Sequence, residues 1–91
     1  MKVGRYLLIK GRVQGVGYRY HTQREAIKLG LRGFVKNLPN GDVRVCVEGE
    51  KETVEYFISF LKKGPGFADV DEIKITEYQN ENKYKDFTVS Y

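Results

Sequence analysis

Residues 5–30 read RYLLIKGRVQGVGYRYHTQREAIKLG and contain the signals of three consecutive elements. The stretch from Arg5 to Val13 is rich in Leu, Ile, Val and Tyr, which is typical of a β-strand. Glycines then interrupt the pattern in Gln14-Gly15-Val16-Gly17 and predict a tight loop. Thr22-Gln23-Arg24-Glu25 has the spacing of a capping box, so we expect a helix that begins at Thr22 and ends at Gly30. The residues expected on its apolar side are Ala26, Ile27 and Leu29.

The middle of the chain predicts a β-hairpin. Residues 33–37 suggest a short strand, and Asn40-Gly41 is a turn signal. After the turn, valines alternate with other residue types, which predicts a strand with one buried face. Cys46 lies between two of these valines, so its thiol should point to the opposite face of the sheet. The inward-facing residues are expected to be Val43, Val45 and Val47.

A second helix and two more strands are predicted in the remainder. From Glu50 to Lys63 the apolar residues follow the i, i+3, i+4, i+7 spacing of an amphipathic helix, which Gly64-Pro65 ends. Apolar residues between Val70 and Ile75, and again from Phe87 to Tyr91, predict two strands. The polar stretch over residues 79–85 is expected to be the loop between them. The apolar residues of the helix are Val54, Phe57, Ile58 and Leu61.

The order strand, helix, strand, strand, helix, strand, with a short extra strand at the C-terminus, predicts an α+β fold. It is the split βαβ arrangement (βαββαβ) of ferredoxin-like sandwiches, in which two helices cover one face of an antiparallel sheet. The first and third strands should then lie side by side at the centre. A chain of 91 residues has room for one core, so residues 1–91 are expected to form a single domain.

Composition restricts the function classes. With 41% hydrophobic and 31% charged residues and no long apolar run, the chain is expected to be a cytoplasmic protein without a signal peptide or membrane segment. Cys46 and His21 are the only cysteine and histidine, so neither a disulfide nor a Cys/His metal site is predicted. The aromatic residues Phe57, Phe60 and Phe87 are expected in the core.

Charge is distributed unevenly along the chain. Residues 1–46 carry ten Lys and Arg against two acids, and residues 47–91 carry six Lys against ten acids. All six arginines lie in the first half. Arginine suits carboxylate and phosphate, so the first half could handle an anionic ligand. A solvated charged surface explains the same numbers, and charge alone does not decide between the two interpretations.

The loop between the first strand and first helix is the candidate binding site. Glycines there let backbone N–H groups turn toward an anion, and a helix N-terminus favours phosphate. The pattern is neither a dinucleotide fingerprint nor a P-loop, and a plain tight turn with a surface arginine would also explain it. The residues of the candidate phosphate loop are Gln14, Gly15, Val16, Gly17, Tyr18 and Arg19.

Two motifs resemble the signatures of a known family. Residues 9–19, IKGRVQGVGYR, resemble the first signature of the acylphosphatases, enzymes that hydrolyse the carboxyl-phosphate bond of acyl phosphates. Residues 33–49, which contain GFVKN followed by Gly41 and Gly49, resemble the second signature at the matching spacing. The family fold is ferredoxin-like. One departure is Tyr18, where the family more usually has Phe or Met.

The resemblance implies a role for two residues. Arg19 takes the position of the arginine that binds the phosphoryl group, and Asn37 that of the asparagine that orients the attacking water. An acyl phosphate has a good leaving group, so the implied enzyme needs no metal, no cofactor and no strong general acid. Without the resemblance, Asn37 would more simply begin the turn that ends at Gly41. His21 and Cys46 receive no function.

Two other functions fit part of the sequence. A basic chain with a ferredoxin-like sheet suggests RNA binding, and Arg32-Gly33-Phe34 imitates the start of the third-strand motif of an RNA recognition module. The aromatic residues that should follow are missing, so no nucleic-acid partner is expected. Carbamoyl phosphate is a possible substrate if the chain is related to the acylphosphatase-like domain of hydrogenase-maturation carbamoyltransferases, but 91 residues leave no room for the transferase domain. We expect a monomer that acts on small acyl phosphates.

Overall fold

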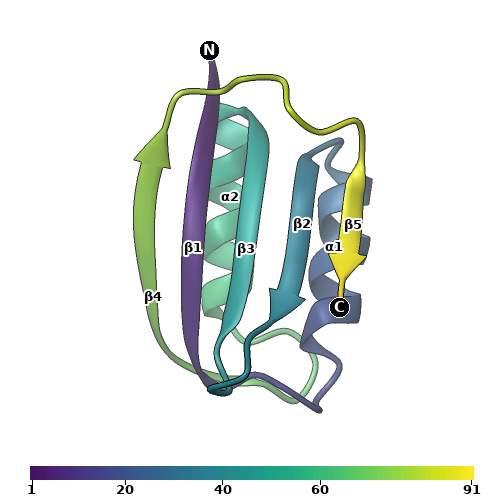
Figure 1. Cartoon of the computed structure of the whole chain (residues 1–91), viewed down its shortest axis with the longest axis vertical. Coiled ribbons are helices and arrows are strands. Elements are labelled where there is room, and N and C mark those ends of the chain that lie inside the picture. Colours follow the sequence, from purple (N-terminus) through teal and green to yellow (C-terminus); the bar gives the residue numbers. More distant parts are fainter.

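The computed structural model describes all residues from 1 to 91. It confirms the predicted element order, including the extra strand at the C-terminus (Figure 1). The elements are β1 (Lys2–Arg12), α1 (Tyr18–Lys28), β2 (Arg32–Asn37), β3 (Val43–Glu50), α2 (Lys51–Lys62), β4 (Asp69–Tyr78) and β5 (Phe87–Ser90). Neither helix is both long enough and apolar enough to span a membrane.

The five strands form one sheet in the order β4-β1-β3-β2-β5, with β1 beside β3 as predicted. The three pairings among the first four strands, β1 with β3, β1 with β4 and β2 with β3, are all antiparallel. The terminal strand differs from the expected antiparallel pattern, because β5 runs parallel to β2. After β4 the chain crosses the upper edge of the sheet in Figure 1 and enters β5 in the direction of β2. This parallel pairing brings the C-terminus to the end of the sheet where β2 finishes.

Both helices cover one face of the sheet and enclose the core between them and the strands (Figure 1). Sixteen apolar residues form this core. They include the predicted inward-facing valines of β3 and the predicted apolar stripe of α2. Phe57 of α2 meets Phe87 of β5 edge-on at 5.9 Å between ring centroids, so the core extends to the terminal strand.

Helix α1 begins four residues earlier than the capping box predicted. Gly17, in the left-handed conformation with φ 81°, precedes the first helical residue, and no side chain caps the helix. The Thr22 hydroxyl is buried and donates to the carbonyl of Tyr18 at 2.7 Å, so it bonds backward within the helix. The helix ends at left-handed Gly30 as predicted, but Ile27 is 58% exposed. The buried residues of α1 are Tyr18, Thr22 and Ala26, spaced four apart.

The outer face of the sheet, which carries no helix, is partly covered by residues 79–86, the connection between β4 and β5. Buried Glu48 holds this connection, because its carboxylate accepts hydrogen bonds from the backbone N–H of Lys83 at 3.2 Å and from the Tyr78 hydroxyl at 2.9 Å. Cys46 lies on this face as predicted, 3.0 Å from the Tyr78 hydroxyl. Burial together with bonding to Cys46 and Glu48 raises the pKa of Tyr78.

Candidate active site

The glycine loop and the first turn of α1 present a row of free backbone donors. The first N–H that donates within this segment is that of His21, to the carbonyl of Gly17 at 3.1 Å. No backbone N–H of residues 15–20 donates a hydrogen bond within the protein. Such groups at a helix N-terminus are suited to an anion. The early start of α1 therefore places Arg19 in the helical turn that carries these donors.

The side chain of Arg19 is held by the C-terminal strand. Its Nη1 donates to the carbonyl of Ser90 at 3.4 Å, and its Cζ lies 4.9 Å from the centroid of the Tyr91 ring. Both contacts depend on the parallel pairing of β5 with β2, which carries residues 90 and 91 past the start of α1. The guanidinium is thus anchored on one side, which leaves other donors of its planar fork available.

Asn37 is the last residue of β2, directly before the turn to β3. The turn is closed by the N–H of Leu38, which donates to the carbonyl of Asp42 at 2.8 Å. The carbonyl oxygen Oδ1 of Asn37 is buried and receives no hydrogen bond from the protein. A buried acceptor without a donor is uncommon in proteins, so this oxygen is available to a ligand.

Arg19 and Asn37 line the same hollow, which has a volume of about 290 Å³. Gly15, Gly17 and Tyr18 of the predicted phosphate loop also line it. The combination of a guanidinium, free N–H groups and one amide side chain can bind a tetrahedral anion and hold a polar molecule beside it. Its complete lining is Val13, Gly15, Gly17, Tyr18, Arg19, Tyr20, Gln23, Asn37, Val89 and Tyr91.

Two residues of the predicted loop, Gln14 and Val16, do not line the hollow. The Nε2 of Gln14 donates to the carbonyls of Leu38 and Asp42, both at 2.8 Å, and so ties the loop to the turn after Asn37. The carbonyl of Val16 accepts a bond of 3.4 Å from the N–H of Phe67. These residues hold the loop in place.

Tyr18 faces the core below the loop. Its side chain is fully buried, and its hydroxyl donates to the carbonyl of Leu61 at the end of α2, at 3.2 Å. Burial raises the pKa of Tyr18, which keeps the phenol protonated. The departure from the usual Phe or Met thus adds a link between the two helices.

Several residues that line the hollow could not be predicted from the sequence motifs. Gln23 lies four positions after Arg19 and therefore on the same side of α1, a relationship that follows from the sequence only if the helix begins at Tyr18. Tyr20 directly follows Arg19 in the first turn of the helix. Val89 and Tyr91 carry no local signal, because they reach the hollow through the long-range pairing of β5. His21, to which no function was given, is partly exposed and does not line the hollow.

The sequence model of the Acylphosphatase family matches residues 5–89. The chain belongs to the acylphosphatase family. Both the resemblance seen in the two motifs and the assignment to this class of enzyme are confirmed. The match includes Arg19, Asn37 and the whole of the hollow's lining except Tyr91.

Relatives of known name agree with this membership. An acylphosphatase of Geobacter sulfurreducens is 42% identical over the full length of both chains. The crystal structure of an acylphosphatase from Bacillus subtilis superposes with a TM-score of 0.94 at 36% identity, covering 98% of this chain and 99% of that one. Full-length HypF, solved in a phosphate- and nucleotide-bound form, matches all of this chain with a TM-score of 0.86 at 33% identity, but only 12% of its own length is covered.

Proposed function

We propose that the protein hydrolyses acyl phosphates to a carboxylate and inorganic phosphate, with Arg19 and Asn37 as its catalytic residues. The observation that carries this proposal is that Arg19, Asn37 and the loop with its free N–H groups meet at one hollow. The names of the family's members favour the same substrate class. The activity is proposed to reside in one domain over residues 1–91.

In the proposed complex the phosphoryl group sits in the loop from Gln14 to Arg19. Its oxygens accept hydrogen bonds from the N–H groups of residues 15–20 and from the guanidinium of Arg19. Phosphoryl transfer passes through a loose transition state whose charge is spread over these oxygens. Donors fixed in advance around that charge stabilise it without reorganisation, which is the main source of the expected rate enhancement.

Asn37 is proposed to orient the attacking water. Its buried Oδ1, which has no donor in the protein, accepts a hydrogen bond from that water, and its amide nitrogen can donate to the water or to a phosphoryl oxygen. The water oxygen attacks phosphorus, and the bond between phosphorus and the carboxyl oxygen breaks with its electron pair going to the carboxylate. Holding the water in line removes much of the entropic cost of bringing it there.

The proposed reaction uses no metal and no general acid of the protein. A carboxylate leaves readily without protonation. Of the water's two protons, one stays on the oxygen now bonded to phosphorus and the other passes to another phosphate oxygen or to solvent. No group of three or more His, Cys, Asp or Glu side chains converges in the protein, so the chain supplies no ready set of metal ligands. Full activity in the presence of EDTA would agree with this part of the proposal.

The test compares two arginines of the same helix. Arg19→Ala should reduce kcat/KM on a generic acyl phosphate by about a hundredfold or more, on the order of 3 kcal/mol. Arg24→Ala is the matched control, because Arg24 is exposed on α1 and does not line the hollow. It should stay within about twofold of the wild type. Equal losses in both variants would refute the assignment of Arg19.

We further propose that the protein acts as a monomer in the cytoplasm and needs no nucleic acid for this activity. Arg19, Asn37 and the phosphate loop lie in one chain, so the proposed mechanism calls on no residue of a second copy. Sedimentation at the concentration of the activity assay tests the monomer directly.

A further inference from the structure

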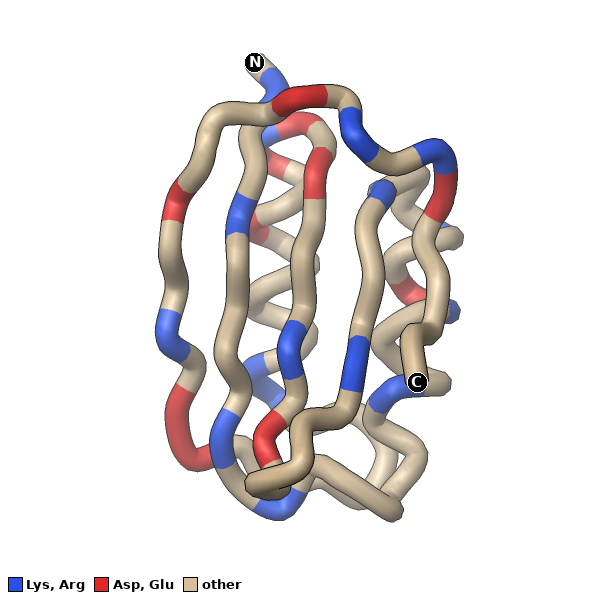
Figure 2. The backbone as a smooth tube through the Cα atoms, viewed as in Figure 1, with Lys and Arg blue, Asp and Glu red and all other residues tan.

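The outer face of the sheet carries a row of three cations. Lys74 of β4 and Arg44 of β3 both pair with Leu8 of β1, and Arg44 pairs in turn with Lys36 of β2. Lys36 and Arg44 point away from the core, because their strand neighbours Val35 and Val43 are buried beneath the sheet. Lys74 lies on the same face because it pairs with Leu8, whose own strand neighbours Leu7 and Ile9 are buried. Figure 2 shows blue segments on β4, β3 and β2 at similar heights.

This row does not stabilise the fold. Lys36 and Arg44 are directly opposite on neighbouring strands, and like charges in that position are destabilising. None of the protein's four ion pairs includes either residue or Lys74. The adjacent cation, Lys10, is by contrast paired with Asp42 at 2.8 Å. Three cations without an ion-pair partner on one patch provide donors and positive charge for an anionic ligand.

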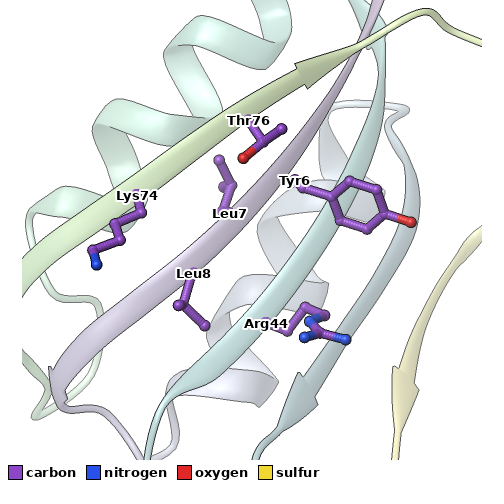
Figure 3. Close-up of a pocket in the computed structure, with 6 residues that line it drawn as sticks. All are labelled: Tyr6, Leu7, Leu8, Arg44, Lys74 and Thr76. Carbon is purple, nitrogen blue, oxygen red and sulfur yellow. The ribbon is translucent and has the colours of Figure 1, made fainter.

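An apolar and aromatic surface lies beside the cations. Figure 3 shows Leu8 between Lys74 and Arg44, with the Tyr6 ring next to them on the same face. Together with Leu7 and Thr76 these residues line a hollow of about 440 Å³. The Tyr6 side chain is 40% exposed, so part of its ring is open to a ligand. A planar ring attached to a multiply charged anion would match both halves of this surface.

The size of the open surface restricts the ligand. Residues 79–86 cover the neighbouring part of the sheet, where Tyr84 lies edge-on to Phe34 at 5.9 Å between ring centroids. Tyr6 is the only aromatic residue that lines this hollow. Tyr78, whose ring centroid lies 5.0 Å from that of Tyr6, and Tyr84 line a separate, neighbouring hollow of about 230 Å³ that Tyr6 also borders. Single-stranded nucleic acids are usually held by several rings that stack successive bases. One ring beside three cations instead fits one base with several phosphates.

We propose that this hollow is a second binding site, separate from the catalytic one, and that it takes a free nucleoside polyphosphate. The base lies against Tyr6 and Leu8, and the phosphates contact Arg44 and Lys74, which line the hollow. Lys36, which is paired with Arg44 outside the hollow, contacts the outermost phosphate. The two hollows share no residue. The inference does not depend on the proposed hydrolysis, because every residue of the site lies outside the catalytic machinery.

The experiment measures ATP binding by equilibrium dialysis and by amide chemical-shift changes. It is performed in the Arg19→Ala background, so that the phosphate loop contributes little. Saturable binding with shift changes on β1, β3 and β4 around Tyr6 and Arg44 is expected. Arg44→Ala combined with Lys74→Ala should weaken binding by about tenfold or more, because charge-assisted contacts are lost. Lys62→Ala, which removes an exposed charge on α2, is the matched control and should stay within about twofold.

Three further probes separate a nucleotide from other ligands. Tyr6→Leu should weaken ATP binding roughly fivefold or more but leave inorganic triphosphate binding unchanged, since only the base stacks. Adenosine alone should bind far more weakly than ATP. Absence of saturable ATP binding, or equal effects of the double variant and Lys62→Ala, would overturn the proposal. So would a poly-dT oligonucleotide that binds more tightly than ATP, because the occupant would then be nucleic acid.

Discussion

The guanidinium carbon of Arg19 lies 4.9 Å from the centroid of the Tyr91 ring, although the two residues are 72 positions apart in the chain. A cation over the face of a ring is held by electrostatic attraction. The last residue of the chain therefore helps to fix the side chain that we propose binds phosphate. The same ring lines the hollow, so its removal would change both the position of Arg19 and the shape of the site.

Tyr91→Leu is accordingly expected to reduce kcat/KM several-fold, since a cation–π contact contributes about 0.5–2 kcal/mol. Tyr91→Phe keeps the ring and should retain nearly all of the activity. Steady-state kinetics on a generic acyl phosphate separates the two. A Phe variant as impaired as the Leu variant would assign the effect to the hydroxyl rather than to the ring face.

Gln14 is expected to act on substrate binding through the loop rather than by contact. Gln14→Ala removes two hydrogen bonds between the loop and the turn after Asn37. Each such bond contributes about 1 kcal/mol, so the free energy of unfolding should fall by roughly 1–2 kcal/mol, and the inhibition constant of inorganic phosphate should rise. Urea unfolding and phosphate inhibition measure the two effects. Unchanged phosphate inhibition would show that the tie does not position the loop.

Tyr18 should affect stability without affecting catalysis. Tyr18→Phe loses the bond to the Leu61 carbonyl and is expected to cost about 1 kcal/mol of unfolding free energy at neutral pH, with kcat unchanged. A tenfold fall in kcat would place the hydroxyl in the chemistry instead.

The same variant should change how stability depends on pH. The pKa of Tyr18 is raised by burial, so the folded state keeps its proton where the unfolded chain has lost it, above a pH of about 10. The contribution of the Tyr18 phenol to the free energy of unfolding is therefore complete below that pH and is lost as the pH rises further. In Tyr18→Phe the free energy of unfolding should decline less steeply with pH, by up to about 1.4 kcal/mol per pH unit, because unfolding of this variant releases one proton fewer. Parallel curves for the two proteins would contradict the burial of an un-ionised phenol.

Gly33, part of the second signature, is expected to be structural. A Cβ on this residue would lie 1.8 Å from the carbonyl oxygen of Cys46 on the neighbouring strand, and its φ of 142° is one that L-residues rarely adopt. Gly33→Ala should therefore unfold the protein or lower its melting temperature strongly. Gly41→Ala, which also has a positive φ but would meet no atom within 4 Å, should cost much less. Thermal unfolding of both variants is the measurement.

Much of the fold could be predicted because local patterns and tertiary packing agree. The alternating valines of β3 and the apolar stripe of α2 face the core in the structure as their spacing indicates. The start of α1 could not be predicted in this way. Thr22 and Glu25 have the spacing of a cap, but the chain turns into the helix at Gly17 and the Thr22 hydroxyl bonds backward to Tyr18. Local propensity was overridden by burial of one face of the helix.

The residues of the candidate site likewise fall into two groups, those that a local sequence motif predicts and those that only long-range packing brings to the hollow. Arg19 and Asn37 lie in two continuous motifs, residues 9–19 and 33–49, so both could be predicted from the sequence. Val89 and Tyr91 reach the hollow only because β5 pairs in parallel with β2, and no local pattern encodes the partner of a four-residue strand. Gln14 belongs to the loop motif, but its bonds to the turn after Asn37 depend on how β1 and the hairpin pack.

The most direct test of the proposed mechanism is the single-turnover rate of Asn37→Ala on a generic acyl phosphate, measured on protein whose unfolding curve shows that it is folded. Asn80→Ala, in the connection between β4 and β5, serves as the control. The mechanism predicts a rate at least about a hundredfold below that of the wild type, with phosphate binding largely retained. A folded Asn37→Ala protein that turns over at the wild-type rate would contradict it.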